Sequence, residues 1–139
     1  MDQKIALLAG CCAVADGGKV SSETVRDLRD ILSLFVGEIV SEDDYQEIIV
    51  ELKNESYIQQ DSDTITVTRE GQALSQSIFT RLVGQTNFEN FNRMLADYKK
   101  APEIYLKQIS PNIKSLQDRY ENKTKNEDLS KSQAIGFVL

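Results

Sequence analysis

The chain has 139 residues, enough for one domain with a sizeable core, and its 40% hydrophobic and 27% charged content is typical of a folded globular protein. It contains no histidine, which excludes a Ser-His-Asp triad, a histidine-assisted cysteine nucleophile and any zinc site built on histidine. The sequence also shows no phosphate-binding loop and no metal-ligand cluster. We therefore expect a protein that is not an enzyme, with no catalytic residue, metal or cofactor.

The net charge of −6 is unevenly distributed along the chain. Residues 1–92 carry seven Lys and Arg against sixteen Asp and Glu, a net charge of −9, whereas residues 93–139 carry nine against six, a net charge of +3. An acidic surface repels nucleic acid and attracts basic partners. The front half of the chain is thus better suited to binding a protein than to binding DNA.

The first predicted element is a helix over residues 3–15, where apolar residues recur at helical spacing at Ile5, Leu8 and Cys11 or Cys12. The two cysteines are adjacent, and adjacent cysteines rarely pair because the disulfide ring is strained. We expect both to be reduced residues of the core, which fits a cytoplasmic protein.

The N-terminus contains an imitation of a lipoprotein cleavage site, LAGC at residues 8–11. The apolar stretch between Lys4 and Cys11 is shorter than the roughly 7–15 residues of a secretory signal. No segment of the sequence is long enough to cross a membrane. We therefore expect neither export nor membrane association.

Two further helices are predicted before residue 56. The turn DGGK at 16–19 ends the first helix, and Ser21 or Ser22 is the expected N-cap of the second. Ser41 is the expected N-cap of the third helix, in an approximate capping box with Asp44. The apolar faces are Val25, Leu28, Leu32 and Phe35 in the second helix and Tyr45, Ile48, Ile49 and Leu52 in the third.

Residues 57–68 predict a β-hairpin. Tyr57 and Ile58 start its first strand, the acidic sequence DSD at 61–63 forms the turn, and TITVT at 64–68 alternates polar and apolar residues. A two-stranded hairpin is marginally stable alone, so it must lie on the helices.

A fourth helix follows the hairpin directly. Thr68 is its expected N-cap, Leu74, Ile78 and Leu82 its predicted apolar face, and Gly84 its end. A fifth helix is predicted from the apolar residues Phe88, Phe91, Leu95 and Tyr98.

The C-terminal region predicts a helix with a near-heptad apolar seam. Pro111 interrupts it, either as a kink or as the first residue of a new helix capped by Ser110. The polar segment ENKTKNEDLSKS is expected to be frayed, and the apolar AIGFVL at 134–139 can dock on the domain or bind another molecule. The seam residues are Tyr105, Ile109, Ile113, Leu116 and Tyr120.

The order helix, helix, helix, hairpin, helix over residues 3–83 resembles a winged helix-turn-helix domain. In that superfamily a third helix ends in a polar break, and two wing strands and a Thr-x-x-Gly helix start follow. The segment ELKNESYIQQDSDTITVTREGQAL is similar to this pattern, and a residue without Cβ at Gly71 lets the new helix lie close to the hairpin base. The connection at 33–40 is longer than the roughly three to four residues of a tight helix-turn-helix. The matching positions are Leu52, Tyr57, Ile58, Ile65, Val67, Thr68, Gly71 and Leu74.

A second resemblance covers residues 15–32, where AVADGGKVSSETVRDLRDIL is similar to the helix break of tellurite-resistance TerB-like domains. Those domains are all helical, so the predicted hairpin favours the winged-helix interpretation. The positions that carry this minor alternative are Ala15, Asp16, Gly17, Val20 and Glu23.

We thus predict a mainly α fold with a small two-stranded β-hairpin. A winged helix-turn-helix domain spans residues 1–84, a C-terminal helical extension spans 85–122, and a polar, flexible tail spans 123–139.

Winged-helix domains commonly place their third helix in the major groove, so the resemblance implies a DNA-binding transcriptional regulator. Phosphate contacts, however, need Lys and Arg. The third helix carries a single cation, Lys53, and the turn at 61–63 is acidic as well. The carboxylates of the third helix and its end are Glu42, Asp43, Asp44, Glu47, Glu51 and Glu55. The cations that DNA binding would use are Lys19, Arg26, Arg29, Lys53 and Arg69, with Lys99 and Lys100 further along the chain.

The favoured hypothesis is a non-enzymatic protein-interaction or regulatory module whose acidic face binds a basic protein partner. DNA binding is the alternative. A solvated helix face, with acids at the positive end of the helix dipole, explains the acids of the first turn without any partner. The residues of the acidic face are Glu42, Asp43, Asp44, Tyr45, Gln46 and Glu47.

The C-terminal seam allows two interpretations: it packs back on the domain, or it pairs with a second copy. In winged-helix regulators a C-terminal helix often builds the dimer, so the resemblance implies a homodimer through Tyr105, Ile109, Ile113, Leu116 and Tyr120. In such a dimer the basic residues of the C-terminal region could meet the acidic front of the neighbouring subunit. These are Lys107, Lys114, Arg119, Lys123 and Lys125.

Overall fold

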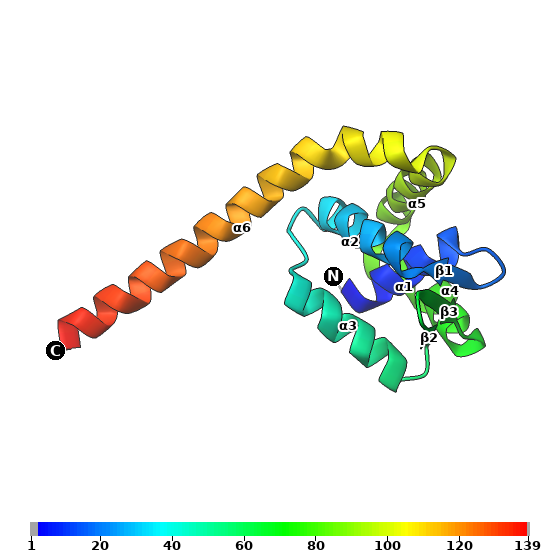
Figure 1. Ribbon diagram of the computed structural model, residues 1–139, viewed down its shortest axis with the longest axis horizontal. Helices are drawn as coiled ribbons and strands as arrows, with labels where there is room; N and C mark the ends of the chain where they lie inside the picture. The colour runs from blue at the N-terminus through cyan, green and yellow to red at the C-terminus, as the bar shows by residue number, and fades with distance from the viewer. Residues whose placement is uncertain (1–2, 139) are drawn as a thin grey trace.

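The computed structural model describes the backbone of residues 3–138 and the side chains of residues 3–123. Within this range the protein is mainly helical, with six helices and one small antiparallel sheet (Figure 1). The elements in chain order are α1 (Gln3–Val14), β1 (Lys19–Ser21), α2 (Ser22–Val36), α3 (Glu42–Asn54), β2 (Ile58–Asp61), β3 (Thr64–Val67), α4 (Arg69–Val83), α5 (Gln85–Lys100) and α6 (Pro102–Val138).

Helix α1 forms the centre of the molecule. Every residue from Ile5 to Cys11 is buried, so this helix is apolar around its whole circumference rather than along one stripe. It packs against α2, α3, α4 and α5, which surround it (Figure 1). Gly10 lies where α1 meets the side chains of Leu28 in α2 and Phe91 in α5.

The predicted N-caps of three helices are confirmed. The Ser21 side chain accepts a hydrogen bond from Thr24 N (3.1 Å), and Ser41 accepts one from Asp44 N (3.2 Å). Thr68 caps α4 by accepting from Gly71 N (3.1 Å). Each cap satisfies an amide at a helix start that has no partner within the helix.

The sheet has three strands in the order β1-β3-β2, one more than the sequence predicts. Ile65 of β3 pairs with Val20 of β1 on one side and with Gln60 of β2 on the other. The turn before β1 contains Gly17 and Gly18, both with positive φ. Strand β1 has only three residues, which are too few to show the alternating pattern of a strand. Its partner β3 lies far along the sequence, so no local signal predicts the pairing.

Thr68 and Gly71 join the hairpin to α4. The Thr68 hydroxyl donates to Ser56 O (2.7 Å), and Thr68 N donates to Tyr57 O (3.0 Å). A Cβ added at Gly71 would lie 2.3 Å from Tyr57 O and 3.1 Å from a methyl group of Val67. The expectation that Gly71 allows close approach of helix and hairpin is therefore confirmed.

The predicted apolar face of α4 is wrong in part. The buried residues are Gly71, Ser75, Phe79 and Val83, whereas Leu82 is 49% exposed. The contact of Gly71 with the hairpin fixes the rotation of α4 about its axis, and residues four apart then face α1. The predicted residues Leu74 and Ile78 lie half-buried beside this row.

Helix α6 packs back on its own chain. Tyr105, Ile109 and Leu116 are buried, and α6 contacts α2 and α5. Of the two interpretations of the seam, these three residues fit packing back on the same chain, and a homodimer through them stays a prediction. Of the other seam residues, Ile113 is half-buried and Tyr120 is 40% exposed.

Pro111 lies inside α6 and starts no new helix. Figure 1 shows α6 bending and its C-terminal half extending away from the other helices. The backbone of α6 is helical to Val138, and the flexibility expected for residues 123–139 stays a prediction. Between Pro111 and Gly136 the sequence contains no proline or glycine, so no strong helix breaker interrupts this segment. The side chains of AIGFVL and of Lys125 lie outside the described residues.

The fifth helix is as predicted, with Phe91, Leu95 and Tyr98 buried. The Phe91 ring lies 4.7 Å from Phe35 and 5.3 Å from Phe79, centroid to centroid, which joins α2, α4 and α5. The Tyr98 hydroxyl donates to Asp27 Oδ2 at 2.6 Å and ties α5 to α2. No described helix is both long enough and apolar enough to span a bilayer.

Replacing Gly71 by Ala is expected to lower the free energy of unfolding by about 1–3 kcal/mol, because the new methyl group meets a backbone carbonyl. Gly10→Ala is the matched control, since a Cβ there meets only side-chain atoms at 3.6 Å or more. Its helical position should make that change neutral or stabilising, by up to about 1 kcal/mol. Urea denaturation followed by circular dichroism measures both, and equal effects would contradict the close approach at Gly71.

Burial and the bond with Asp27 raise the pKa of Tyr98 from 10.0 to about 12. A phenol whose pKa is raised on folding stabilises the protein fully below its unfolded pKa, so this contribution should be lost between pH 10 and 12. Tyr98→Phe should make the loss of stability in this range shallower, and it should cost about 1–3 kcal/mol at neutral pH. Tyr57→Phe is the control: it removes a hydroxyl that has no hydrogen-bond partner among the described residues, so it should cost less than Tyr98→Phe at neutral pH. An unaltered profile for Tyr98→Phe would contradict the assignment.

Candidate functional site

The solvent-facing side of α3 is an acidic surface with one apolar residue in it. Asp43, Asp44 and Glu47 are exposed, and Val50 is 51% exposed. Residues three and four apart lie on the same side of a helix, so Asp43, Glu47 and Val50 form one strip. The prediction named the acids but not Val50, although the helical spacing of the buried residues Ile48, Ile49 and Leu52 leaves Val50 on the opposite side. These four exposed residues, Asp43, Asp44, Glu47 and Val50, are called the α3 acidic surface below.

Tyr45 does not belong to this surface. It was predicted both as a residue of the apolar face and as a partner contact, and its side chain is buried. Its ring lies under two guanidinium groups, with Arg26 Cζ at 5.4 Å and Arg29 Cζ at 5.8 Å from the ring centroid. Burial raises the pKa of Tyr45. The residue therefore fastens α3 to α2 through cation–π contacts and is not available to a partner.

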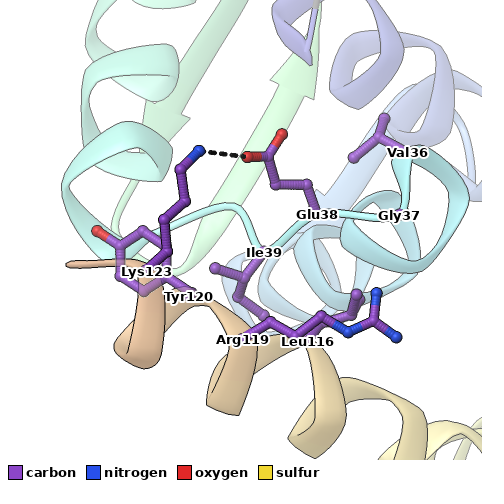
Figure 2. Close-up of a pocket in the computed structure, with 8 residues that line it drawn as sticks. All are labelled: Val36, Gly37, Glu38, Ile39, Leu116, Arg119, Tyr120 and Lys123. Atoms are coloured by element: carbon purple, nitrogen blue, oxygen red, sulfur yellow. Dashed lines mark ion pairs between the residues drawn. The ribbon is translucent and has the colours of Figure 1, made fainter. Parts of the chain in front are cut away.

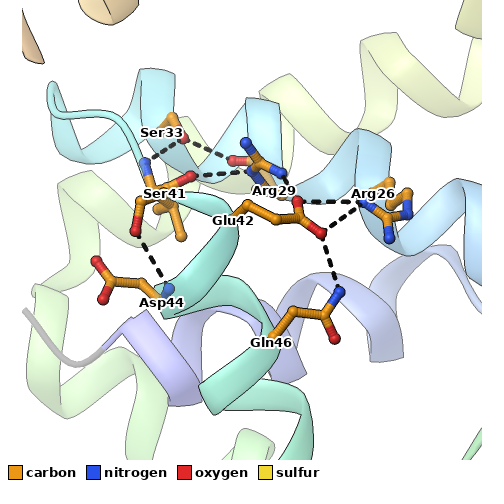
Figure 3. A network of polar contacts seen from close by, with 8 residues as sticks. Arg26, Arg29, Ser33, Ser41, Glu42, Asp44 and Gln46 are labelled. Carbon is orange, nitrogen blue, oxygen red and sulfur yellow. Dashed lines mark hydrogen bonds and ion pairs between the residues drawn. The ribbon is translucent and has the colours of Figure 1, made fainter. Parts of the chain in front are cut away.

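Glu42 is also occupied within the chain (Figure 3). Arg26 Nη1 donates to its two carboxylate oxygens at 3.2 and 3.3 Å, Arg29 Nη1 donates to Oε2, and Gln46 Nε2 donates to Oε1 at 2.9 Å. The hydrogen bond from Gln46, followed by that from Arg26, holds the pKa of the Glu42 carboxyl below its ordinary value. Glu42 thus stays charged and joins α3 to α2.

Two side chains of α2 fix the connection that precedes α3 (Figure 3). Ser33 Oγ, which is buried, accepts from Val40 N (3.0 Å), and Arg29 Nε donates to Val40 O (2.9 Å). Helix α2 ends at Val36, so the connection is residues 37–41 and shorter than predicted. Because both backbone groups of buried Val40 have partners on α2, the start of α3 is held in one position.

The acids at the other end of α3 are partly neutralised from α1. Lys4 Nζ lies 2.7 Å from Glu55 Oε1 and 3.7 Å from Glu51 Oε2. The unpaired acidic charge of α3 therefore concentrates in its first two turns, at Asp43, Asp44 and Glu47.

The five cations predicted for DNA binding do not form one basic surface. Arg26 and Arg29 converge, but on Glu42. Lys19 lies on β1, Lys53 in the last turn of α3, and Arg69 at the start of α4. No contact among the described residues brings these three together with the arginine pair.

The turn of the hairpin is acidic, as predicted. Asp61 and Asp63 are exposed, and Ser62 between them has a positive φ of 56°. Asp63 O accepts a hydrogen bond from Ser22 N at 2.7 Å, which ties the turn to the start of α2. The tip of the hairpin therefore carries negative charge.

An open groove of about 280 Å³ lies between the α2–α3 connection and α6 (Figure 2). Buried Ile39 and Leu116 form its apolar part. Lys123 Nζ lies 4.0 Å from Glu38 Oε1, and both side chains are well exposed, so this ion pair contributes little stability. The side chains that line the groove come from both α6 and the connection. They do not place a group of reactive side chains around one point.

The two cysteines are structural. Burial raises the pKa of Cys11 to about 12, and burial also raises the pKa of half-buried Cys12. Thiols with raised pKa are protonated at neutral pH and poor nucleophiles. Among the described residues, no group of three or more Cys, Asp and Glu side chains could hold a metal ion.

Comparisons with protein-family models, with curated proteins and with solved structures found no match. The chemistry of the α3 acidic surface is therefore the basis for assigning a function.

Arg29→Ala is expected to lower the free energy of unfolding by about 1–3 kcal/mol, because it removes a charged donor and leaves the buried Val40 carbonyl without a partner. Arg26→Ala, the matched control, should cost at most about 1 kcal/mol, because its ion pair with Glu42 is exposed. Urea midpoints at constant m-value measure the difference. Equal costs for the two arginines would contradict the role given to the Arg29–Val40 contact.

Proposed function

We propose that the protein is a non-enzymatic winged-helix module that binds a basic segment of a partner protein through the α3 acidic surface. The order of three helices, a hairpin and a fourth helix supports the winged-helix assignment. So does the close contact of Gly71 with the base of the hairpin.

The observation that carries this proposal is the division of the α3 carboxylates into two groups. Glu42, Glu51 and Glu55 have cationic partners within the chain. Asp43, Asp44 and Glu47 have none among the described residues. Attraction to the helix dipole accounts for Asp43 and Asp44 in the first turn, but Glu47 lies beyond it. Glu47 is therefore the acid of this surface that the helix dipole does not explain, and it supports a role in binding.

Val50 adds an apolar contact to this acidic surface. It is half-exposed on the side of α3 that carries Asp43 and Glu47. A single apolar residue within an acidic strip suits a partner segment in which lysine or arginine flanks one apolar side chain. Such charge complementarity speeds association and fixes register, and its effect weakens as salt rises.

The alternative, a DNA-binding transcriptional regulator, has less support. Affinity for DNA comes mainly from cations placed against phosphates. In this protein Arg26 and Arg29 are engaged by Glu42, and the outward side of α3 is anionic. A cytoplasmic location is part of the proposal, since the thiols of Cys11 and Cys12 are unpaired and suit a reducing compartment.

A ¹⁵N-labelled sample titrated with a lysine-rich helical peptide carrying one central leucine tests this function. Chemical-shift changes should concentrate on the exposed residues of 43–54, and affinity should fall as salt is added. The double variant Asp43→Lys/Glu47→Lys should weaken binding about tenfold or more, since each reversed rim charge removes an attraction and adds a repulsion.

The matched control is Glu89→Lys/Glu121→Lys, which changes the net charge equally at exposed positions of α5 and α6. It should leave binding nearly unchanged. Shift changes scattered over all acidic residues, or equal weakening in the control, would show non-specific charge attraction and overturn the assignment of the surface. Binding of wild-type protein to duplex DNA at low salt would instead favour the regulator hypothesis.

A further inference from the structure

Two arginines of α2 converge on a single carboxylate of α3 (Figure 3). Arg26 and Arg29 are one turn apart, and both donate to Glu42. A guanidinium group offers five N–H donors in a planar fork that matches both carboxylate and phosphate oxygens. The pair therefore carries one more positive charge than its internal partner neutralises.

The arginines are held in place by contacts other than Glu42. Arg29 Nε donates to Val40 O, and both guanidinium groups lie over the ring of buried Tyr45. Neither contact involves the Glu42 carboxylate. The donors are thus preorganised for an anion, which lowers the entropic cost of binding one.

The Glu42 carboxylate, which the two arginines bind, is accessible to solvent. The Glu42 side chain is 49% exposed and that of Arg26 is 53% exposed. The exposed Arg26–Glu42 pair contributes little to stability, whereas the Arg29 side chain is only 21% exposed and is also bound to Val40 O. Gln46 also donates to Glu42 and directs its carboxylate toward the arginines.

We propose that Arg26 and Arg29 form a phosphate-binding pair that the Glu42 carboxylate occupies, and that Glu42 thereby prevents this end of α3 from binding the backbone of nucleic acid. Glu42 is then a residue that determines specificity by exclusion. This inference does not depend on the proposed protein partner, because it concerns a different set of side chains and a different ligand.

Removing the carboxylate tests the inference. Glu42→Ala should bind a fluorescently labelled short DNA duplex about five- to tenfold more tightly than wild type at low ionic strength, with a log K against log salt slope steeper by about 1–2, as expected for one or two new phosphate contacts. The gain is limited because Asp43 and Asp44 remain nearby. Fluorescence anisotropy over a salt series gives both quantities.

Glu47→Ala is the matched control, because it removes the same charge from the exposed side of α3 without touching the arginines. It should raise affinity much less and leave the salt slope unchanged. In the Glu42→Ala background, Arg26→Gln/Arg29→Gln should abolish the gain.

Glu42→Gln, which keeps the shape of the side chain, serves if the alanine variant melts early, and thermal unfolding of each variant is followed alongside. Equal gains for residues 42 and 47, or a gain that survives loss of both arginines, would overturn the inference. A result of that kind would leave the peptide-binding test of the α3 acidic surface unaffected.

Discussion

The orientation of α3 depends on Arg29. This one side chain contacts the connection before α3, the first residue of α3 and an aromatic ring of its buried face, through Val40, Glu42 and Tyr45. Ser33, one turn along α2, completes the arrangement by binding Val40 N. A connection of five residues between two helices carries several backbone groups that need partners, and here α2 supplies them. Which residues of α3 face water follows from this attachment.

Much of the fold was predictable because local signals mark where helices begin. Ser21, Ser41 and Thr68 cap their helices as expected, and the acidic turn at 61–63 and the close approach at Gly71, which has no Cβ, follow from residue type. The features that were missed depend on partners far away in the sequence. Strand β1 exists because β3 lies beside it, and the rotation of α4 is set by a backbone contact with Tyr57. The apolar residues Tyr105 and Ile109 suit a neighbouring subunit or the same chain equally well, so their pattern could not decide between the two.

The candidate site was predictable in composition but not in detail. The excess of carboxylates on α3 is visible in the sequence. Their division into paired and unpaired groups is not, because Glu42 meets arginines of α2 and Glu55 meets Lys4 of α1. Tyr45 was assigned two incompatible roles, and only the position of the arginines over its ring decides between them. The charged residues of a helix thus indicate its partner only after the ion pairs within the chain show which charges are open to binding.

The central position of α1 has a consequence for how the protein reaches its folded state. During synthesis α1 leaves the ribosome well before α4 and α5, yet these later helices cover much of its apolar circumference. Until they emerge, the nascent chain displays a hydrophobic helix with no place to bury it, a species prone to aggregation. Such long sequence separation between contacting elements also slows the search for the native topology. The apolar circumference of α1 is therefore the part of the growing chain whose burial is completed late.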